Sequence, residues 1–387
     1  MYHRQRGNER RQIPGLADSA QTAGPSPAVF YFPCGEQPGV GMDMAKLREH
    51  VRTHDLKVLR RPLSGEMGAP YLPLALGALM VEERLTFPLF LKVSEGEGGI
   101  ITFRPCFEEG EILDQSWCDS LARAGIDRLY CREEDAEKVI AYLNNHLLLA
   151  GQDSQPTRKR FALMRDHLNL SLYRAFQQPL LAPHLKAARN SLENLGTLIA
   201  AGGFPWKYVW ELLYLDYTLY NHSVNVGIMA LAFLVHLRKP MQDCLAAGLA
   251  GLFHDLGFIR LEESLLHQVE PLTEEQWGQV KKHPGLGYQM LKNNGQIPLD
   301  SLRLILEHHE NADGSGYPQG LPLAQQHPHT RVLFLLEIYD GLTTYRPYRP
   351  AHNSFVALKM LQEERGARGL ACDPETLKNF IKFLALP

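Results

Sequence analysis

The chain has 387 residues, of which 45% are apolar and 21% charged, so it holds enough material for a sizeable core and about two domains. Its formal net charge of -3 argues against binding to a nucleic-acid polymer, because such proteins usually present a strongly basic face. The six cysteines are scattered and form no C-x-x-C pair, which indicates buried thiols in a reducing compartment and argues against a disulfide framework or a zinc finger.

The N-terminal 40 residues are rich in Gly, Pro, Gln and Arg and show no hydrophobic period. We therefore expect residues 1–40 to be disordered. No apolar segment follows their arginines, which argues against a secretory signal. The longest apolar run, residues 226–235, is far shorter than the roughly 20 residues of a membrane span. These features predict a cytoplasmic protein without a membrane span.

Residues 41–150 have the pattern of a small α/β module. Two short strands are expected at "FPLFLKV" (87–93) and "GIITFRP" (99–105), joined by a Gly/Glu turn. An amphipathic helix that ends at Gly125, a further strand and a second helix over 132–149 follow. The segment contains no cluster of catalytic residue types, so we interpret it as a regulatory or dimerisation module.

A polar break, "AGQDSQPTRKR", ends the α/β module, and almost every later segment carries apolar residues at spacings of three and four. This spacing predicts a helical connector over 151–200 and an all-α bundle over 201–387. The long helical stretch between 161 and 215 is also compatible with a homodimer, formed through these helices or through the N-terminal module. The predicted fold class is mainly α, with a small α/β module before the bundle.

The histidines are concentrated in the predicted bundle, where ten of the sixteen lie after residue 220. Five groups stand out, about 25 to 32 residues apart: His222, His254–Asp255, His283, His308–His309 and Asp340. This separation is one helix plus one turn, so each group would come from a different helix. Facing side chains in a bundle core can build a two-metal site. Nitrogen and oxygen ligands without cysteine favour iron, manganese or another mid-row divalent metal over structural zinc.

The alternative for each histidine is a hydrogen-bonded core or surface residue, which is the commoner role of a single histidine in a helix. We interpret the remaining histidines of this half in that way: His236, His267, His327, His329 and His352. The ordered set of five groups, with a double histidine next to Gly-Tyr-Pro, is what favours a metal site.

Five segments resemble the HD-GYP domains, the variant of the HD phosphohydrolases that hydrolyses cyclic di-GMP. They are "YTLYNHSVNVG" (217–227), "HDLG" (254–257), "KKHPGLG" (281–287), "HHENADGSGYPQGL" (308–321) and "DGLTTYRPYRP" (340–350). The resemblance covers roughly residues 200 to 365, with the motifs in the family's order. It implies an HD-type all-α helical bundle that acts as a metal-dependent phosphodiesterase domain.

The resemblance implies seven metal ligands: His222, His254, Asp255, His283, His308, His309 and Asp340. It implies two divalent ions, because members with three carry Glu one helical turn before the first histidine, where this chain has Thr218. Asp255 is the natural bridge between them, and Asp255 and His283 are the expected catalytic residues. Two such ions clamp the scissile phosphate and lower the pKa of a bridging water, whose hydroxide attacks phosphorus.

The stretch after the double histidine predicts a ligand clamp. His308 and His309 end a helix about 100° apart around it, so they can reach different metals. The glycines before Tyr317, notably Gly316, let the backbone turn sharply. The turn would deliver Tyr317 and Pro318 to the mouth of the site, where Tyr317 can stack on guanine or bond a phosphate. In the alternative interpretation, both residues only brace the loop.

Two arginines further along complete the expected substrate site. Arg346 and Arg349, in "RPYR", offer the fork geometry that suits phosphate or the edge of guanine. The alternative is that both are solvated surface residues.

The implied activity is hydrolysis of cyclic di-GMP to pGpG, with further hydrolysis to GMP left open. One departure from the family supports another class of function. The family usually has Lys shortly after His-Asp, to neutralise substrate phosphate, and this chain has Phe258, with Arg260 nearby at a different spacing. The second hypothesis is therefore a catalytically weak or inactive receptor for cyclic di-GMP. A third is an HD hydrolase of another phosphate ester or cyclic dinucleotide.

Overall fold

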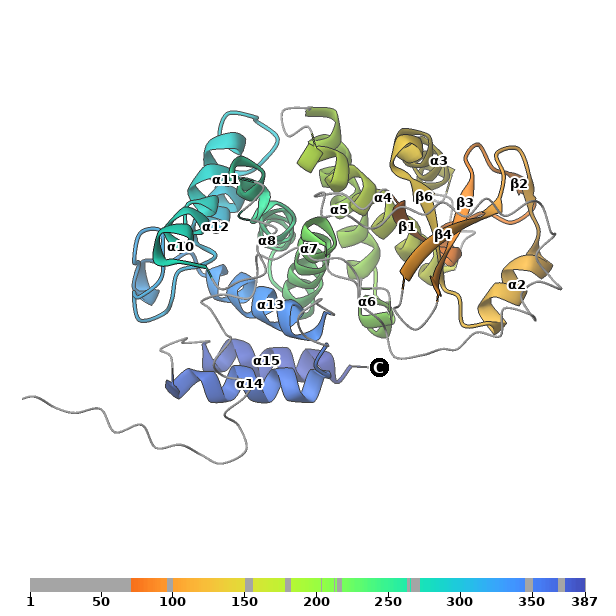
Figure 1. Cartoon of the computed structure of the whole chain (residues 1–387). Helices are drawn as coiled ribbons and strands as arrows, with labels where there is room; N and C mark the ends of the chain where they lie inside the picture. The colour runs from red at the N-terminus through yellow and green to blue at the C-terminus, as the bar shows by residue number, and fades with distance from the viewer. Residues whose placement is uncertain are drawn as a thin grey trace, which may run out of the picture.

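The computed structural model describes residues 71–95, 100–149, 156–177, 182–202, 204–211, 213, 218–262, 265, 272–344, 351–367 and 373–386. The predicted disorder of residues 1–40 and the first part of the predicted module fall outside these residues. The described part of the chain is mainly helical, with a small sheet region ahead of the helices (Figure 1), which confirms the predicted fold class. The division into domains and the homodimer stay predictions.

The sheet region holds a four-stranded antiparallel sheet in the order β1-β6-β3-β4, and a two-stranded ribbon of β2 and β5. Its elements are β1 (Tyr71–Ala75), η1 (Leu76–Ala78), β2 (Glu83–Arg84), β3 (Leu89–Glu95), β4 (Ile100–Phe107), β5 (Ile112–Leu113), α2 (Gln115–Arg123), β6 (Arg128–Arg132), η2 (Glu133–Asp135) and α3 (Ala136–Leu149). The hairpin predicted from the sequence corresponds to β3 and β4, and the two predicted helices correspond to α2 and α3.

The remaining elements of the described part are α-helices and short 3-10 helices. They are α4 (Thr157–Gln177), α5 (Ala182–Ala200), α6 (Lys207–Glu211), α7 (Leu219–His236), α8 (Met241–Phe253), η3 (Leu256–Arg260), α10 (Glu274–Val280), α11 (His283–Leu291), α12 (Leu299–Glu307), η4 (Leu323–Gln325), α13 (Thr330–Thr343), α14 (Ser354–Ala367) and α15 (Pro374–Leu384). None of the helices within the described ranges is both long enough and apolar enough to cross a membrane.

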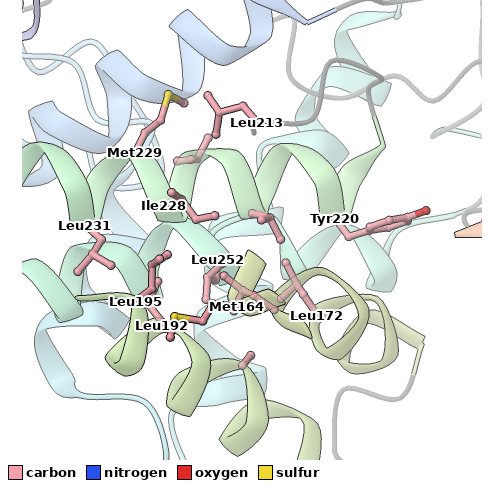
Figure 2. Close-up of a cluster of buried hydrophobic side chains, with 14 of the residues drawn as sticks. Met164, Leu172, Leu192, Leu195, Leu213, Tyr220, Ile228, Met229, Leu231 and Leu252 are labelled. Carbon is pink, nitrogen blue, oxygen red and sulfur yellow. The ribbon is translucent and has the colours of Figure 1, made fainter. Parts of the chain in front are cut away.

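Helix α7 is the centre of the bundle. It is buried from Tyr220 to Leu234 and contacts α4, α5, α8 and α13. A helix that is apolar on all sides is stable only where other helices surround it, as in Figure 1. Figure 2 shows the apolar layer between α7 and its neighbours, in which Met164 and Leu172 of α4 lie near Leu252 of α8.

Glycine lets the backbones of α7 and α8 touch. A Cβ added to Gly251 would lie 2.8 Å from the Cα of Gly227, which is closer than any side chain permits. The contact brings the first turn of α7 beside the end of α8, so the ring centroids of His222 and His254 are 5.3 Å apart.

A second close contact joins η3 to α11. A Cβ added to Gly257 would lie 2.0 Å from the carbonyl oxygen of His283 and 2.7 Å from the amide nitrogen of Gly287. The chain directly after Asp255 therefore lies against the first turn of α11, which begins at His283.

A buried ion pair within α4 is hydrogen-bonded to the backbone of the sheet region. Asp166 accepts hydrogen bonds from the backbone N–H of Ala75 at 2.6 Å and from Arg165 Nε at 2.8 Å. Arg165 and Asp166 are 1% and 0% exposed. Helix α4 also contacts β1, η1 and α3 as well as α5 and α7, so one helix serves both parts of the core.

We predict that Asp166→Ala lowers the free energy of unfolding by about 3–5 kcal/mol, because it leaves the Arg165 guanidinium buried without its carboxylate. The matched control is Glu193→Ala, which removes the half-exposed ion pair with Arg189 on α5 and is expected to cost about 0.5 kcal/mol. Guanidinium unfolding curves measure both. Equal effects of the two substitutions would contradict the prediction.

Candidate metal centre

The structure brings the seven ligands predicted from the motifs to one place inside the helical part. They lie at or near helix ends and in α13: His222 in the first turn of α7, His254 and Asp255 just after α8, His283 at the start of α11, His308 and His309 just after α12, and Asp340 in α13. All seven side chains are buried, and the most exposed, His309, is 6% accessible.

The Asp255 carboxylate lies at the centre, with two imidazoles at each oxygen. Its Oδ2 lies 3.3 Å from His254 Nε2 and 3.9 Å from His222 Nε2. Its Oδ1 lies 3.4 Å from His283 Nε2 and 3.9 Å from His308 Nε2. Two ligands that each bind one metal at about 2.1 Å are themselves about 3.0–3.4 Å apart. The shorter of these separations therefore suit shared cations better than direct hydrogen bonds.

The surrounding imidazoles are oriented by their other nitrogen. Three Nδ1–H groups donate to the backbone carbonyl three residues earlier: His254 to Gly251 at 2.8 Å, His283 to Val280 at 2.8 Å and His308 to Ile305 at 2.7 Å. This bond leaves the Nε2 lone pair pointing into the centre, which is the usual arrangement of a metal-binding histidine. His283 Nε2 and His308 Nε2 are 3.1 Å apart, and two lone pairs at that distance are stabilised by a cation between them.

The donor atoms fall into two groups. One comprises His222, His254 and Asp255, and the other His283, His308 and His309, with the atoms of each group within 4.8 Å of one another. Both oxygens of Asp255, as well as Nε2 of His254 and of His309, are buried without a hydrogen-bond partner among the described residues. Such atoms are costly unless something binds them. The donor set therefore fits two neighbouring cations that share Asp255.

Asp340 differs from the other six. Its Oδ2 accepts from His222 Nδ1 at 2.7 Å, and its Oδ1 accepts from Asn225 Nδ2 at 2.8 Å. In this arrangement it lies behind His222 and orients that ring, and it is not part of either donor group. Direct ligation by Asp340 stays a prediction.

The electrostatics keep Asp255 and the second group of donors in their ligand forms. Burial opposes ionisation of Asp255, but His254 and the other histidines outweigh it and hold the carboxyl pKa below its usual range. Burial lowers the pKa of His283 to about 4, and burial together with neighbouring histidines lowers those of His308 and His309 well below the usual value. For His254, attraction to Asp255 overcomes burial and raises the pKa to about 9. Near neutral pH the second group is thus three neutral imidazoles beside a carboxylate.

The Gly-Tyr-Pro loop packs on the second group of donors. The Tyr317 ring stacks on His309, with ring centroids 4.7 Å apart at 29°. Its hydroxyl is buried without a hydrogen-bond partner in the described part of the chain, and burial raises its pKa well above the usual value. A Cβ added to Gly316 would lie 2.5 Å from the carbonyl oxygen of His309, so only glycine fits beneath the loop. Pro318 follows as an exposed residue.

The Glu310 carboxylate holds this loop by hydrogen bonds. It accepts backbone N–H groups of Gln319 at 2.7 Å, Gly320 at 3.2 Å and Leu321 at 2.8 Å. Three such bonds hold the loop, and with it the Tyr317 ring, in one position. Arg346 and Arg349, predicted to bind substrate, lie outside the described residues.

Two residues that the motifs did not indicate contact the predicted ligands. Glu337, 4% exposed, places Oε2 3.6 Å from His309 Nδ1 and lies one turn before Asp340 on α13. Asn225 lies one turn after His222 and donates to Asp340. Both residues can be recognised in the sequence, because each is a polar residue three positions from a predicted ligand in a mostly apolar helix.

The two departures from the family have clear structural roles. Phe258 is 1% exposed, stacks on His283 with ring centroids 4.0 Å apart at 17°, and packs with Leu265 and Val280. It braces a predicted ligand and presents a buried apolar ring where the family has its lysine. Thr218 is the N-cap of α7, where its side chain accepts the backbone N–H of Asn221.

Part of the chain is similar to known proteins. Residues 212–371 match the HD domain. The chain is 33% identical over 171 residues to "Cyclic di-GMP phosphodiesterase PA4108" of Pseudomonas aeruginosa, across 44% of this chain and 40% of that protein. It is 36% identical over 120 residues to "Cyclic di-GMP phosphodiesterase response regulator RpfG" of Xanthomonas campestris pv. campestris, across 30% and 32%.

A further relative carries a different substrate in its name. It is "3'3'-cGAMP-specific phosphodiesterase 3" of Vibrio cholerae, 33% identical over 167 residues, across 43% of this chain and 35% of that protein. The chain thus spans less than half the length of these curated relatives.

Among solved structures, the fold matches "Bd1817, a HDG"Y"P protein from Bdellovibrio bacteriovorus" with a TM-score of 0.57 at 16% identity, over 81% of this chain and 99% of that chain. The resemblance that the motifs indicated is therefore confirmed: residues 212–371 match the HD domain, similar curated proteins are named cyclic dinucleotide phosphodiesterases, and the fold matches that of an HD-GYP protein.

Proposed function

We propose that this chain is a metal-dependent phosphodiesterase that hydrolyses cyclic di-GMP to pGpG. The observation that carries the proposal is Asp255, a fully buried carboxylate whose two oxygens lack a hydrogen bond among the described residues and face the Nε2 atoms of four imidazoles. The names of relatives at about a third identity support cyclic dinucleotides as the substrate class. Within that class, we propose cyclic di-GMP and not 3'3'-cGAMP as the preferred substrate.

Two divalent ions would be held by the two donor groups. His222, His254 and Asp255 would bind one, and His283, His308 and His309 the other, with Asp255 shared. Nitrogen and oxygen donors without sulfur favour iron or manganese. Such a pair, when bound, polarises the phosphate and supplies a water activated for in-line attack.

The residues of the chain bind and orient the substrate around that pair. The Tyr317 hydroxyl lacks a hydrogen-bond partner among the described residues, and its ring stacks on His309, so it is suited to hydrogen-bond a phosphate oxygen. Gly316 and Pro318 position it, and Arg346 and Arg349 would bind phosphate or the edge of guanine. Burial of the ligands excludes bulk water, which strengthens each electrostatic contact to the phosphate.

The alternative function is a cyclic di-GMP receptor that binds without turnover and signals through the N-terminal module. Phe258 favours it, because its buried ring gives the site no cation at that position. A hydrolase of another phosphate ester is the third candidate.

The test of the proposed function is turnover by the full chain, purified without oxygen and with its metal content counted. We expect pGpG by chromatography, about two metal ions per chain, and kcat/KM for cyclic di-GMP at least about tenfold above that for 3'3'-cGAMP. Tight binding of cyclic di-GMP without product, in fully metallated protein, would favour the receptor. Failure to bind either cyclic dinucleotide would exclude both.

Asp255→Asn is expected to remove metal and activity together. The amide keeps the shape but loses the charge and turns a donor toward one cation, so turnover should fall by more than about 100-fold. Asp243→Asn is the matched control, because that carboxylate lies on α8 with a 40% exposed side chain and contacts only His329 among the ion pairs of the described residues. Metal content equal to that of wild type in Asp255→Asn would refute the assignment.

Phe258→Lys tests whether the missing family lysine limits turnover. Because Phe258 is buried against His283, we expect the ammonium to cost roughly 3 kcal/mol or more of stability without faster turnover. Phe258→Met keeps the apolar volume and should cost less than about 1.5 kcal/mol. Thermal unfolding and kcat are measured on the same samples. A faster enzyme of unchanged stability would show that position 258 can face the substrate.

A further inference from the structure

We infer that Lys281 is a specificity-determining cation of the site, and that it binds the phosphate of a cyclic dinucleotide that does not lie on the metals. The inference rests on the proposed function and deepens it, because it assigns the recognition of a substrate with two phosphates. It follows from the position of one ammonium group relative to the Gly-Tyr-Pro loop.

The Lys281 ammonium lies beside two aromatic rings at the edge of the metal centre. Its Nζ is 5.7 Å from the centroid of Tyr317 and 5.6 Å from that of Trp277. The same Tyr317 ring stacks on His309, which belongs to the second donor group. One aromatic ring therefore separates the ammonium from a predicted metal ligand.

The backbone around Lys281 is held firmly. Lys281 is the C-cap of α10, two residues before His283, the first residue of α11. At its other end α10 begins with a capping box between Thr273 and Gln276. The backbone position of Lys281 is thus coupled to a predicted ligand on one side and to a capped helix on the other.

The charge of Lys281 is available to a ligand. The side chain is exposed and forms no ion pair with a carboxylate of the described residues. Its neighbours are the faces and edges of rings, which orient a cation without neutralising it. An anion that reached the metals past Tyr317 would meet this ammonium.

The neighbouring cations are less suited to the role. Lys282 directs its Nζ to Gln279 Oε1 at 2.7 Å and lies on the exposed surface. Phe258, where the family has its lysine, packs inward on His283. Arg260 is exposed at the end of η3, and no ring contact joins it to Tyr317 or His309 among the described residues.

The chemistry of the substrate explains why a cation is needed beside Tyr317, at the edge of the candidate metal centre. A cyclic dinucleotide carries two phosphodiesters on opposite sides of its ring. When one lies on the metal pair, the other must enter a partly dehydrated site with its charge, which costs free energy unless a cation meets it. A monoester or a simple diester has no second phosphate and would not use Lys281.

The test compares Lys281→Ala with wild type on two substrates. With cyclic di-GMP we expect KM to rise about tenfold, the lower end for loss of a charged hydrogen bond, with kcat within about twofold and metal content unchanged. With bis(4-nitrophenyl) phosphate, which has a single phosphate, kcat/KM should not change. Lys281→Arg should recover most of the affinity, and added salt should raise KM less in Lys281→Ala than in wild type.

Lys282→Ala is the matched control and should behave as wild type. An unchanged KM for cyclic di-GMP in Lys281→Ala, an equal loss in Lys282→Ala, or an equal loss with bis(4-nitrophenyl) phosphate would each overturn the inference while leaving the proposed function intact. Absence of cyclic di-GMP turnover and binding in wild type would instead remove the proposed function, and the role of Lys281 with it.

Discussion

The candidate metal centre depends on one constraint, a carboxylate buried at the junction of several helices. Asp255 is inaccessible to solvent, and its oxygens face the Nε2 atoms of four histidines. An ionised carboxylate in such a place is stable only when positive charge compensates it. The histidines cannot all supply that charge, because burial and mutual repulsion hold most of their pKa values low. Metal cations would resolve the conflict, since they bind neutral imidazoles and the carboxylate together.

Two glycine contacts make this junction possible. Gly227 and Gly251 let α7 and α8 touch, which brings His222 beside His254. Gly257 lets the chain after Asp255 lie on the backbone of His283. At both places a Cβ would separate ligands that the centre needs within a few ångströms. The packing of small residues is therefore as important for the site as the ligands themselves.

Helix α4 links this site to the N-terminal sheet through polar contacts in an apolar core. Near the middle of α4, Asp166 pairs with Arg165 and accepts the N–H of Ala75 in β1. One turn further along, Asn169 donates to Asn221 at 2.7 Å, and Asn221 precedes His222. Burial of unmatched polar groups is costly, so these contacts oppose any sliding of α4 between the sheet and α7.

The sequence by itself determined which helices carry the candidate ligands. A spacing of one helix plus one turn assigned His222, His283 and Asp340 to different helices, because local periodicity sets helix length. Only the tertiary structure decided the directions of the side chains. It turned Phe258 onto His283 and the Tyr317 ring onto His309, and it placed Asp340 behind His222. Those directions depend on contacts between segments far apart in the chain, which no local pattern encodes.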